Sequence, residues 1–305
     1  MNIVNEETVA VITGASGGVG RATARLLGSR RASVGLLARG RRGLEAALRE
    51  IESQGGRAIV IPTDVSDPDG VEAAAAKVQR AFGPITLWIN NAMVSMYSPF
   101  LRMTPKEFCH IVDVTFMGSV HGTRAALRRM VPRDQGVVIQ VGSALAFRSI
   151  PLQSAYCSSK HAIEGFTESV RCELIHEKSS VRITVVNMPA LNTTQFIWTR
   201  NRMGRVCRPV GTIFEPEVAA RAILFAAEHE RREVMVGAST ISATLGEKIA
   251  PGLLDRKLAK AGWDGALCTA KLKPGRRDNF WAPVNRDLGA RGQFGRGARK
   301  SAVLL

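Results

Sequence analysis

The sequence TGASGGVG, residues 13–20, ends the first apolar run of the chain and opens its first helical pattern. Gly14 permits a tight turn, while Gly18 and Gly20 let the backbone and the following helix approach a bound group closely. The helix start adds unpaired N–H groups and the positive end of its dipole, which favour an anion. The stretch therefore predicts a pyrophosphate site, with a merely flexible glycine turn as the alternative. The same turn also contains Ser16 and Val19.

Apolar, β-branched runs alternate with amphipathic stretches from residue 8 to about residue 237. The runs are apolar almost throughout, which is typical of strands buried on both faces of a parallel sheet. Strands are expected at 8–14, 33–39, 58–64, 87–92, 136–143, 181–189 and 232–237. Helices are expected at 21–29, 41–56, 67–83, 104–131, 154–178 and 215–230. This alternation predicts an α/β fold: a doubly wound parallel sheet of the Rossmann type, in a single domain over residues 1–240.

The residues after the second strand indicate which dinucleotide the turn would hold. A carboxylate about 20 residues past the glycines would accept a hydrogen bond from the 2′-hydroxyl of NAD. Here the strand ends in ARGRR, residues 38–42, and no acid comes before Glu45. Because a guanidinium suits a phosphate, we predict NADP(H) in preference to NAD(H), with Arg39 and Ser16 at the 2′-phosphate. The alternative is that these arginines only begin a solvated helix.

The ends of the third and fourth strands carry further candidate cofactor contacts. Asp64 and Val65 are placed to hold the adenine by a side-chain hydrogen bond and a backbone contact. Asn91 and Ala92 lie where the nicotinamide side of a dinucleotide passes. A side-chain amide donates and accepts at once, so Asn91 has the alternative role of tying neighbouring strands together.

A serine, a tyrosine and a lysine follow the fifth strand. Ser143 ends this strand, thirteen residues before Tyr156, and Tyr156 and Lys160 share a helix face because they are four residues apart. An ammonium within about 4–6 Å, helped by the positive nicotinamide ring of an oxidised cofactor, lowers the pKa of a tyrosine. We therefore predict that Tyr156 is a general acid/base with a lowered pKa and that Ser143 holds the substrate oxygen beside it.

Together these motifs resemble those of the short-chain dehydrogenase/reductase family. The turn fits TGxxxGxG, the DV and NNA pairs follow at the expected places, and Ser143 with YCSSK fits Ser…YxxxK. The resemblance covers about residues 8–240. It implies that hydride moves between the nicotinamide and a substrate carbon, that Tyr156 gives or takes the proton of the substrate oxygen, and that Lys160 binds the nicotinamide ribose. It also implies nicotinamide contacts from Pro189 and Thr194.

Three positions depart from the family pattern and indicate a divergent subgroup with a C-terminal extension. Thr115 stands where the family usually has an asparagine whose backbone holds a water that relays protons from the lysine. By its position, Thr115 is included among the candidate catalytic residues. A threonine lacks the paired donor and acceptor of the amide, so the sequence leaves open whether the proton relay works as usual or is slower. Met93 and Ala190 replace two usual glycines.

The long connection after the sixth strand predicts a lid or substrate loop. Phe196 and Trp198 are its candidate substrate contacts, although aromatics that only pack under the loop are the alternative. The helical extension at 241–270 has three alternatives: it covers the substrate pocket, lies on a membrane surface or packs against another subunit. The family resemblance implies a homodimer or homotetramer formed through the helices at 104–131 and 154–178.

Charge and composition bound the remaining function classes. The net charge is +16, and residues 271–305 carry nine Lys/Arg against two Asp. This Gly/Arg-rich segment has little apolar surface, so we expect a solvated, flexible tail. Nucleic-acid binding is disfavoured because few aromatics interleave the charges. The cysteine spacing gives no metal site and predicts reduced thiols, and the N-terminus lacks a secretory pattern, so a cytoplasmic protein is expected.

The sequence therefore predicts an NADP(H)-dependent oxidoreductase that interconverts a carbonyl and an alcohol. The expected substrate is a small, fairly apolar carbonyl compound or alcohol. The alternative is a cofactor-binding sensor or scaffold without turnover, and Thr115 is the only feature that favours it.

Overall fold

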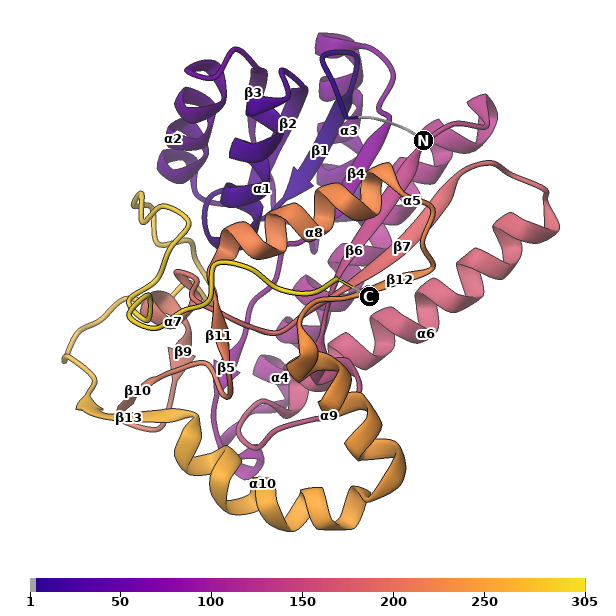
Figure 1. The fold of residues 1–305 in the computed structure, drawn as a ribbon. Coiled ribbons are helices and arrows are strands. Elements are labelled where there is room, and N and C mark those ends of the chain that lie inside the picture. Colours follow the sequence, from indigo (N-terminus) through magenta and orange to yellow (C-terminus); the bar gives the residue numbers. More distant parts are fainter. Residues whose placement is uncertain (1–3, 305) are drawn as a thin grey trace.

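The computed structural model describes residues 4–304. Its centre is a seven-stranded parallel sheet in the order β12-β7-β6-β4-β1-β2-β3 (Figure 1). The seven strands are β1 (Val9–Thr13), β2 (Ser33–Ala38), β3 (Arg57–Pro62), β4 (Leu87–Asn90), β6 (Val137–Ser143), β7 (Arg182–Met188) and β12 (Glu233–Met235). Six lie within a predicted run and β3 begins one residue before its run, and the doubly wound α/β fold is confirmed.

Helices cover both faces of this sheet, and each face has its own apolar core. One face carries α1 (Gly18–Ser29), α2 (Arg41–Glu52) and α8 (Pro216–Glu228). The other carries α3 (Pro68–Phe82), α4 (Pro105–Val112), α5 (Gly118–Met130) and α6 (Ser154–His176). Since the order of the strands reverses between β1 and β4, a crevice opens at the carboxyl ends of these two strands.

The stretch expected as one helix at 104–131 is divided in the structure. A π-helical turn at Asp113–Met117 joins α4 to α5. The Thr104 hydroxyl and the Glu107 side chain form a reciprocal capping box that fixes the start of α4. Such π turns are frequent at functional sites, and this one carries Thr115.

Short strands and turns line the rim of the crevice. They are β5 (Met96–Tyr97), β8 (Ala190–Leu191), α7 (Gln195–Trp198), β9 (Arg200–Asn201), β10 (Arg205–Cys207) and β11 (Ile213–Phe214), with 3₁₀ turns at Phe100–Arg102 and Ala144–Ala146. A further 3₁₀ turn, Val131–Arg133, ends α5 at the opposite edge of the sheet. The extension forms α9 (Ala238–Ile249), α10 (Pro251–Gly265) and β13 (Leu267–Lys271). Because β13 pairs with β10, the extension folds back against the loop that follows β7. No helix among residues 4–304 is both long and apolar enough to span a bilayer.

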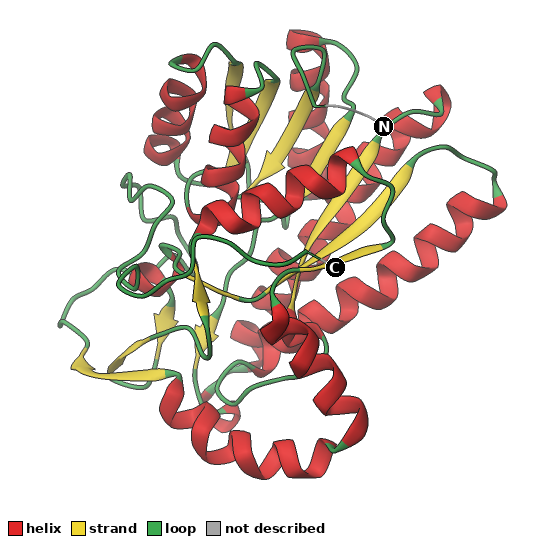
Figure 2. Ribbon diagram, viewed as in Figure 1, coloured by secondary structure: helices red, strands yellow, loops and turns green. Residues whose placement is uncertain are grey.

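The segment after β13 differs from the flexible tail that its composition predicts. It has no regular structure (Figure 2), yet it lies along the domain and the Phe280 side chain is fully buried. Hydrogen bonds to main-chain carbonyls hold the segment besides this ring: Asn279 N–H donates to the Trp198 carbonyl at 3.0 Å, and the Arg276 guanidinium donates to the carbonyls of Ile197 and Thr199. Backbone hydrogen bonds of this kind leave no periodic signal in a sequence.

We predict that Phe280→Ala lowers the free energy of unfolding by about 3 kcal/mol, since it removes a fully buried ring next to His110 and Arg200. Urea denaturation measures this loss. Trp281→Ala is the control, because it removes a larger ring that is 44% exposed and should cost less. Equal losses from the two substitutions would contradict the burial of Phe280 as the anchor of the segment.

Candidate active site

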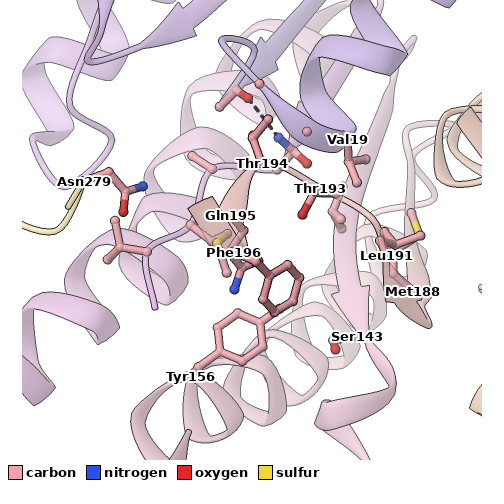
Figure 3. A pocket seen from close by; sticks show the side chains of 18 of the residues that line it. Val19, Ser143, Tyr156, Met188, Leu191, Thr193, Thr194, Gln195, Phe196 and Asn279 are labelled. Atoms are coloured by element: carbon pink, nitrogen blue, oxygen red, sulfur yellow. Dashed lines mark hydrogen bonds between the residues drawn. The ribbon is translucent and has the colours of Figure 1, made fainter. Parts of the chain in front are cut away.

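A cavity of about 440 Å³ lies at the carboxyl ends of the central strands. This volume is within the range of small-molecule sites. Its wall includes the glycine turn, the ends of β3, β4, β6 and β7, and part of the C-terminal segment. Ser143, Tyr156 and Phe196 are directed into it, and Asn279 lies across the cavity from Ser143 (Figure 3).

The glycine turn is shaped by close approaches that no side chain would allow. Gly14 has φ +70°, and a Cβ on it would lie 2.9 Å from the Ala92 Cα. A Cβ on Gly20 would lie 2.4 Å from the Gly14 carbonyl oxygen. The turn therefore folds tightly onto itself, and it lines the cavity at the start of α1. One N–H there, that of Gly18, makes a long hydrogen bond of 3.4 Å to the Gly289 carbonyl. A helix start at a cavity wall is the kind of backbone cradle that a pyrophosphate needs.

Asn91 joins the turn to the neighbouring strand. Its side-chain amide donates to the carbonyls of Thr13 at 2.9 Å and of Gly14 at 3.3 Å, and its N–H donates to the Thr13 hydroxyl. Asn91 and Ala92 both line the cavity. Of the two roles left open by the sequence, the observed contacts are those of a residue that ties β4 to β1.

The end of β3 reaches the cavity as expected. Asp64 and Val65 both line it. The Asp64 carboxylate accepts hydrogen bonds from the N–H and the hydroxyl of Ser66, at 3.0 Å and 2.8 Å, which fixes its orientation. Ser16 and Val19 line the same cavity on the other side of β1.

Arg39 reaches the cavity, but its guanidinium is already bound. It donates to the carbonyls of Phe280 at 3.0 Å and Trp281 at 3.2 Å, and also to the carbonyl of Asn279. Burial lowers the pKa of Arg39, and the nearby Asp64 acts against this shift. Sequence reasoning did not foresee this contact, because the two partners are about 240 residues apart.

The three residues of the Ser…YxxxK motif meet at the carboxyl end of β6. Ser143 N–H donates to the Asn187 side chain at 2.9 Å, and the Ser143 hydroxyl accepts the Leu145 N–H at 3.1 Å. The Tyr156 hydroxyl shares a hydrogen bond with the Ser143 side chain. Lys160 is buried below them; its Nζ donates to the Val141 carbonyl at 2.6 Å and lies 5.7 Å from the centre of the Tyr156 ring.

The expected lowering of the Tyr156 pKa does not occur in this arrangement. Burial raises the pKa of Tyr156, and the hydrogen bond with Ser143 only partly offsets this. Burial also lowers the pKa of Lys160 to about 8. The physical reason is that loss of hydration disfavours both charged forms, while the Lys160 ammonium points to the Val141 carbonyl rather than to the phenol. Tyr156 is therefore a neutral phenol at neutral pH.

Thr115 is not brought to the cavity wall. Its side chain is fully buried in the π turn, where the hydroxyl donates to the Val94 carbonyl at 3.1 Å and accepts the Val94 N–H at 3.3 Å. The Thr115 carbonyl accepts the Ser119 hydroxyl at 3.0 Å. The Thr115 side chain therefore serves the backbone of the loop after β4, and its part in a proton relay, which would run through its carbonyl, stays a prediction.

The loop after β7 supplies the remaining predicted residues. Pro189 and Thr194 line the cavity, and the Thr194 hydroxyl oxygen is buried without a hydrogen-bond partner among residues 4–304. A Cβ on Gly17 would lie 2.9 Å from this oxygen and 3.0 Å from Trp198. Trp198 thus packs on the glycine turn, whereas Phe196 lies 6.4 Å, centroid to centroid, from Tyr97. An unpaired hydroxyl beside an anion cradle fits a polar cofactor.

Several cavity residues were missed by sequence reasoning. Tyr97 is buried in its wall, and Leu258 and Ser239 of the extension line it as well. Arg148 fastens the extension through ion pairs with Glu247 and, at 2.6 Å, Asp255. The amphipathic pattern of α9 and α10 gave a signal for packing, but no signal for this partner. Of the three alternatives for the extension, the observed contacts are those of a segment that covers the pocket.

Comparison with known proteins decides the family. The sequence profile described as short chain dehydrogenase matches residues 8–203. The chain belongs to the short-chain dehydrogenase/reductase family. It is 34% identical over 259 residues to the uncharacterized oxidoreductase YxnA of Bacillus subtilis (strain 168), covering 84% of this chain and 72% of YxnA. The match to YxnA is longer than the family match over residues 8–203, so it includes residues outside that range.

Two solved structures of this family are similar to the chain. A metagenomic short-chain oxidoreductase in complex with NADP is 29% identical, with a TM-score of 0.65, over 76% of this chain and 98% of that protein. The alcohol dehydrogenase of the archaeon Thermococcus sibiricus, complexed with 5-hydroxy-NADP, is 25% identical with a TM-score of 0.65, over 75% of this chain and 95% of that protein. Both leave about a quarter of this chain unmatched.

We predict that Lys160→Met stabilises the fold at neutral pH. The pKa of Lys160 is about 8 in the folded protein against 10.5 for an exposed lysine, so the folded state binds this proton less tightly than the unfolded chain. The loss of folding stability caused by the buried ammonium is complete below pH 8, and it becomes smaller as the pH rises towards 10.5. We expect the variant to gain about 1–2 kcal/mol at pH 7 and much less near pH 10, as measured by urea denaturation.

Lys77→Met, at an exposed position of α3, is the matched control and should change stability little at either pH. A Lys160→Met protein less stable than the parent at pH 7 would show that the buried ammonium is stabilised rather than strained.

We predict that Thr115→Val lowers the free energy of unfolding by about 1–3 kcal/mol, because both Val94 backbone groups lose their hydroxyl partner in a fully buried site. Thr115→Ser, which keeps the hydroxyl, should retain most of the stability. Thermal unfolding of the two variants separates the outcomes, and a stable valine variant would refute the role of the hydroxyl in holding the loop after β4.

Proposed function

We propose that this protein is an NADP(H)-dependent oxidoreductase that interconverts a carbonyl and an alcohol. The observation that carries the proposal is the hydrogen-bonded pair of Ser143 and Tyr156 at the edge of a cavity, with Lys160 buried beneath. NADPH, when bound, supplies the hydride. The glycine turn holds its pyrophosphate, and the unpaired Thr194 hydroxyl, with Pro189, meets the nicotinamide.

Tyr156 acts as the acid of the reduction. Because burial raises its pKa, the phenol keeps its proton at neutral pH and can donate it to the substrate oxygen. Ser143 holds that oxygen through its hydroxyl, which is itself fixed by the Leu145 N–H. Lys160, largely protonated at pH 7 with a pKa of about 8, places a positive charge below the phenol. This charge stabilises the phenolate that remains after proton transfer.

The proposed substrate is a fairly apolar molecule. Phe196, Tyr97 and Leu258 line the cavity around Tyr156, and the extension closes this end. Ordered apolar walls exclude water and favour ligands with hydrocarbon groups. A homodimer or homotetramer through α4–α5 and α6, in the cytoplasm, completes the proposal. The preference for NADP(H) is supported by the lack of an acid at the end of β2 and by the two NADP complexes among similar structures.

We predict that Tyr156→Phe lowers the turnover of NADPH with a panel of ketones and aldehydes at least about 1,000-fold, since the proton donor is lost. Its affinity for NADPH, measured by titration calorimetry, should stay within about threefold. Tyr97→Phe is the matched control, because the chain has two tyrosines and both line this cavity.

We expect Tyr97→Phe to keep turnover within about tenfold. If Tyr156→Phe reduces substrate at the parent rate, the assigned chemistry is wrong. If the parent binds NADPH but oxidises it with no member of the panel, a sensor or scaffold without turnover is favoured, the alternative that Thr115 in place of the usual asparagine favours.

A further inference from the structure

The C-terminal segment forms one wall of the cofactor end of the cavity. Asn279, Pro283, Val284 and Arg286 line it next to the end of β2. A Cβ on Gly40 would lie 3.4 Å from the Pro283 Cβ, so the two segments are in contact. The segment therefore lies where the adenosine ribose of a dinucleotide would sit.

Two neighbouring side chains fix the segment at this place. The Asn285 side-chain oxygen accepts the Arg42 N–H at 3.0 Å, at the start of α2. Asp287 lies 3.6 Å from the guanidinium of Arg21, which is buried and held by Glu50 at 2.8 Å. Arg286 stands between these anchors, so its backbone position is set from both sides.

Arg286 is a cation at the cavity wall that is open to a ligand. Within residues 4–304 its guanidinium has no hydrogen-bond or ion-pair partner. By contrast, two other arginines of the segment have partners. Arg276 donates to carbonyls of the loop after β7, and Arg291 pairs with the Glu217 carboxylate of α8. An open guanidinium at the ribose end of the cavity matches a phosphate monoester in charge and geometry.

Arg39 has a different task. Three consecutive carbonyls, of Asn279, Phe280 and Trp281, accept hydrogen bonds from its guanidinium. Because the N–H groups of the Arg39 guanidinium already donate to these carbonyls, it is poorly placed for a bidentate phosphate contact, although its positive charge remains nearby. It instead clamps the segment that carries Arg286.

We propose that Arg286 is the direct ligand of the 2′-phosphate of NADPH and that Arg39 is a positioning residue that holds the C-terminal segment over the cofactor. This assignment rests on the proposed function, because it requires a dinucleotide with a ribose phosphate. It makes the segment outside the shared domain part of the cofactor site and the determinant of cofactor choice.

The test is titration calorimetry of the full chain with NADPH and with NADH. Arg286→Ala should weaken NADPH binding about 10- to 100-fold and leave NADH binding within about twofold, because only NADPH offers the phosphate. Arg286→Lys should recover part of the loss. Arg296→Ala is the matched control: it removes the same charge from an exposed position of the segment that does not line the cavity, and it should change neither affinity more than about twofold.

A double-mutant cycle tests the role of Arg39. If Arg39 acts through Arg286, Arg39→Ala lowers the preference for NADPH in the parent but not in the Arg286→Ala protein. An equal drop in both backgrounds would overturn the positioning role and return the phosphate to Arg39. A parent that prefers NADPH and an Arg286→Ala protein that keeps this preference overturn the inference alone. A parent that binds NADH as tightly as NADPH overturns the proposed cofactor preference itself.

Discussion

The close contact between the glycine turn and the end of β4 is the constraint on which the site depends. Gly14 can approach Ala92 only because it lacks a Cβ and adopts φ +70°, and the Asn91 amide then bonds to the carbonyls of Thr13 and Gly14. This contact holds the carboxyl ends of β1 and β4 side by side, at the point where the strand order reverses. The cradle at α1 and the rim that carries Ser143 are thereby placed on either side of a single cavity.

The same burial that shapes the cavity sets its charges. Lys160 is held under the cavity floor by one carbonyl, so its ammonium is costly and its pKa falls to about 8. Tyr156 is kept neutral for the same reason. In the proposed reaction, Tyr156 is the proton donor, and the positive charge of Lys160 acts mainly on the phenolate that exists only after the proton has left. On that proposal, the buried charge lowers the stability of the fold in return for a stabilised phenolate.

The sequence predicted the sheet, its helices and the Ser…YxxxK cluster, because each leaves a local signal: a continuous apolar run, a glycine turn or an i,i+4 pair. It did not foresee contacts whose partner is distant and polar. Arg39 reads as a phosphate ligand when only its neighbours are known, yet its guanidinium is taken by carbonyls near residue 280. Thr115 reads as a catalytic residue by position, while its buried hydroxyl serves the backbone of Val94.

The composition of the C-terminal segment explains why it looked disordered and yet is ordered. A chain rich in glycine and arginine has too little apolar surface to fold alone, so its order depends on partners in the domain. Those partners are Arg39, Arg21 and the start of α2. Arg39 and the start of α2 also line the cavity. A ligand that binds there gains contacts only while the segment is in place, and it stabilises that segment in turn. On the proposed assignment of Arg286, cofactor binding and the order of the segment are therefore coupled by the same few guanidinium groups.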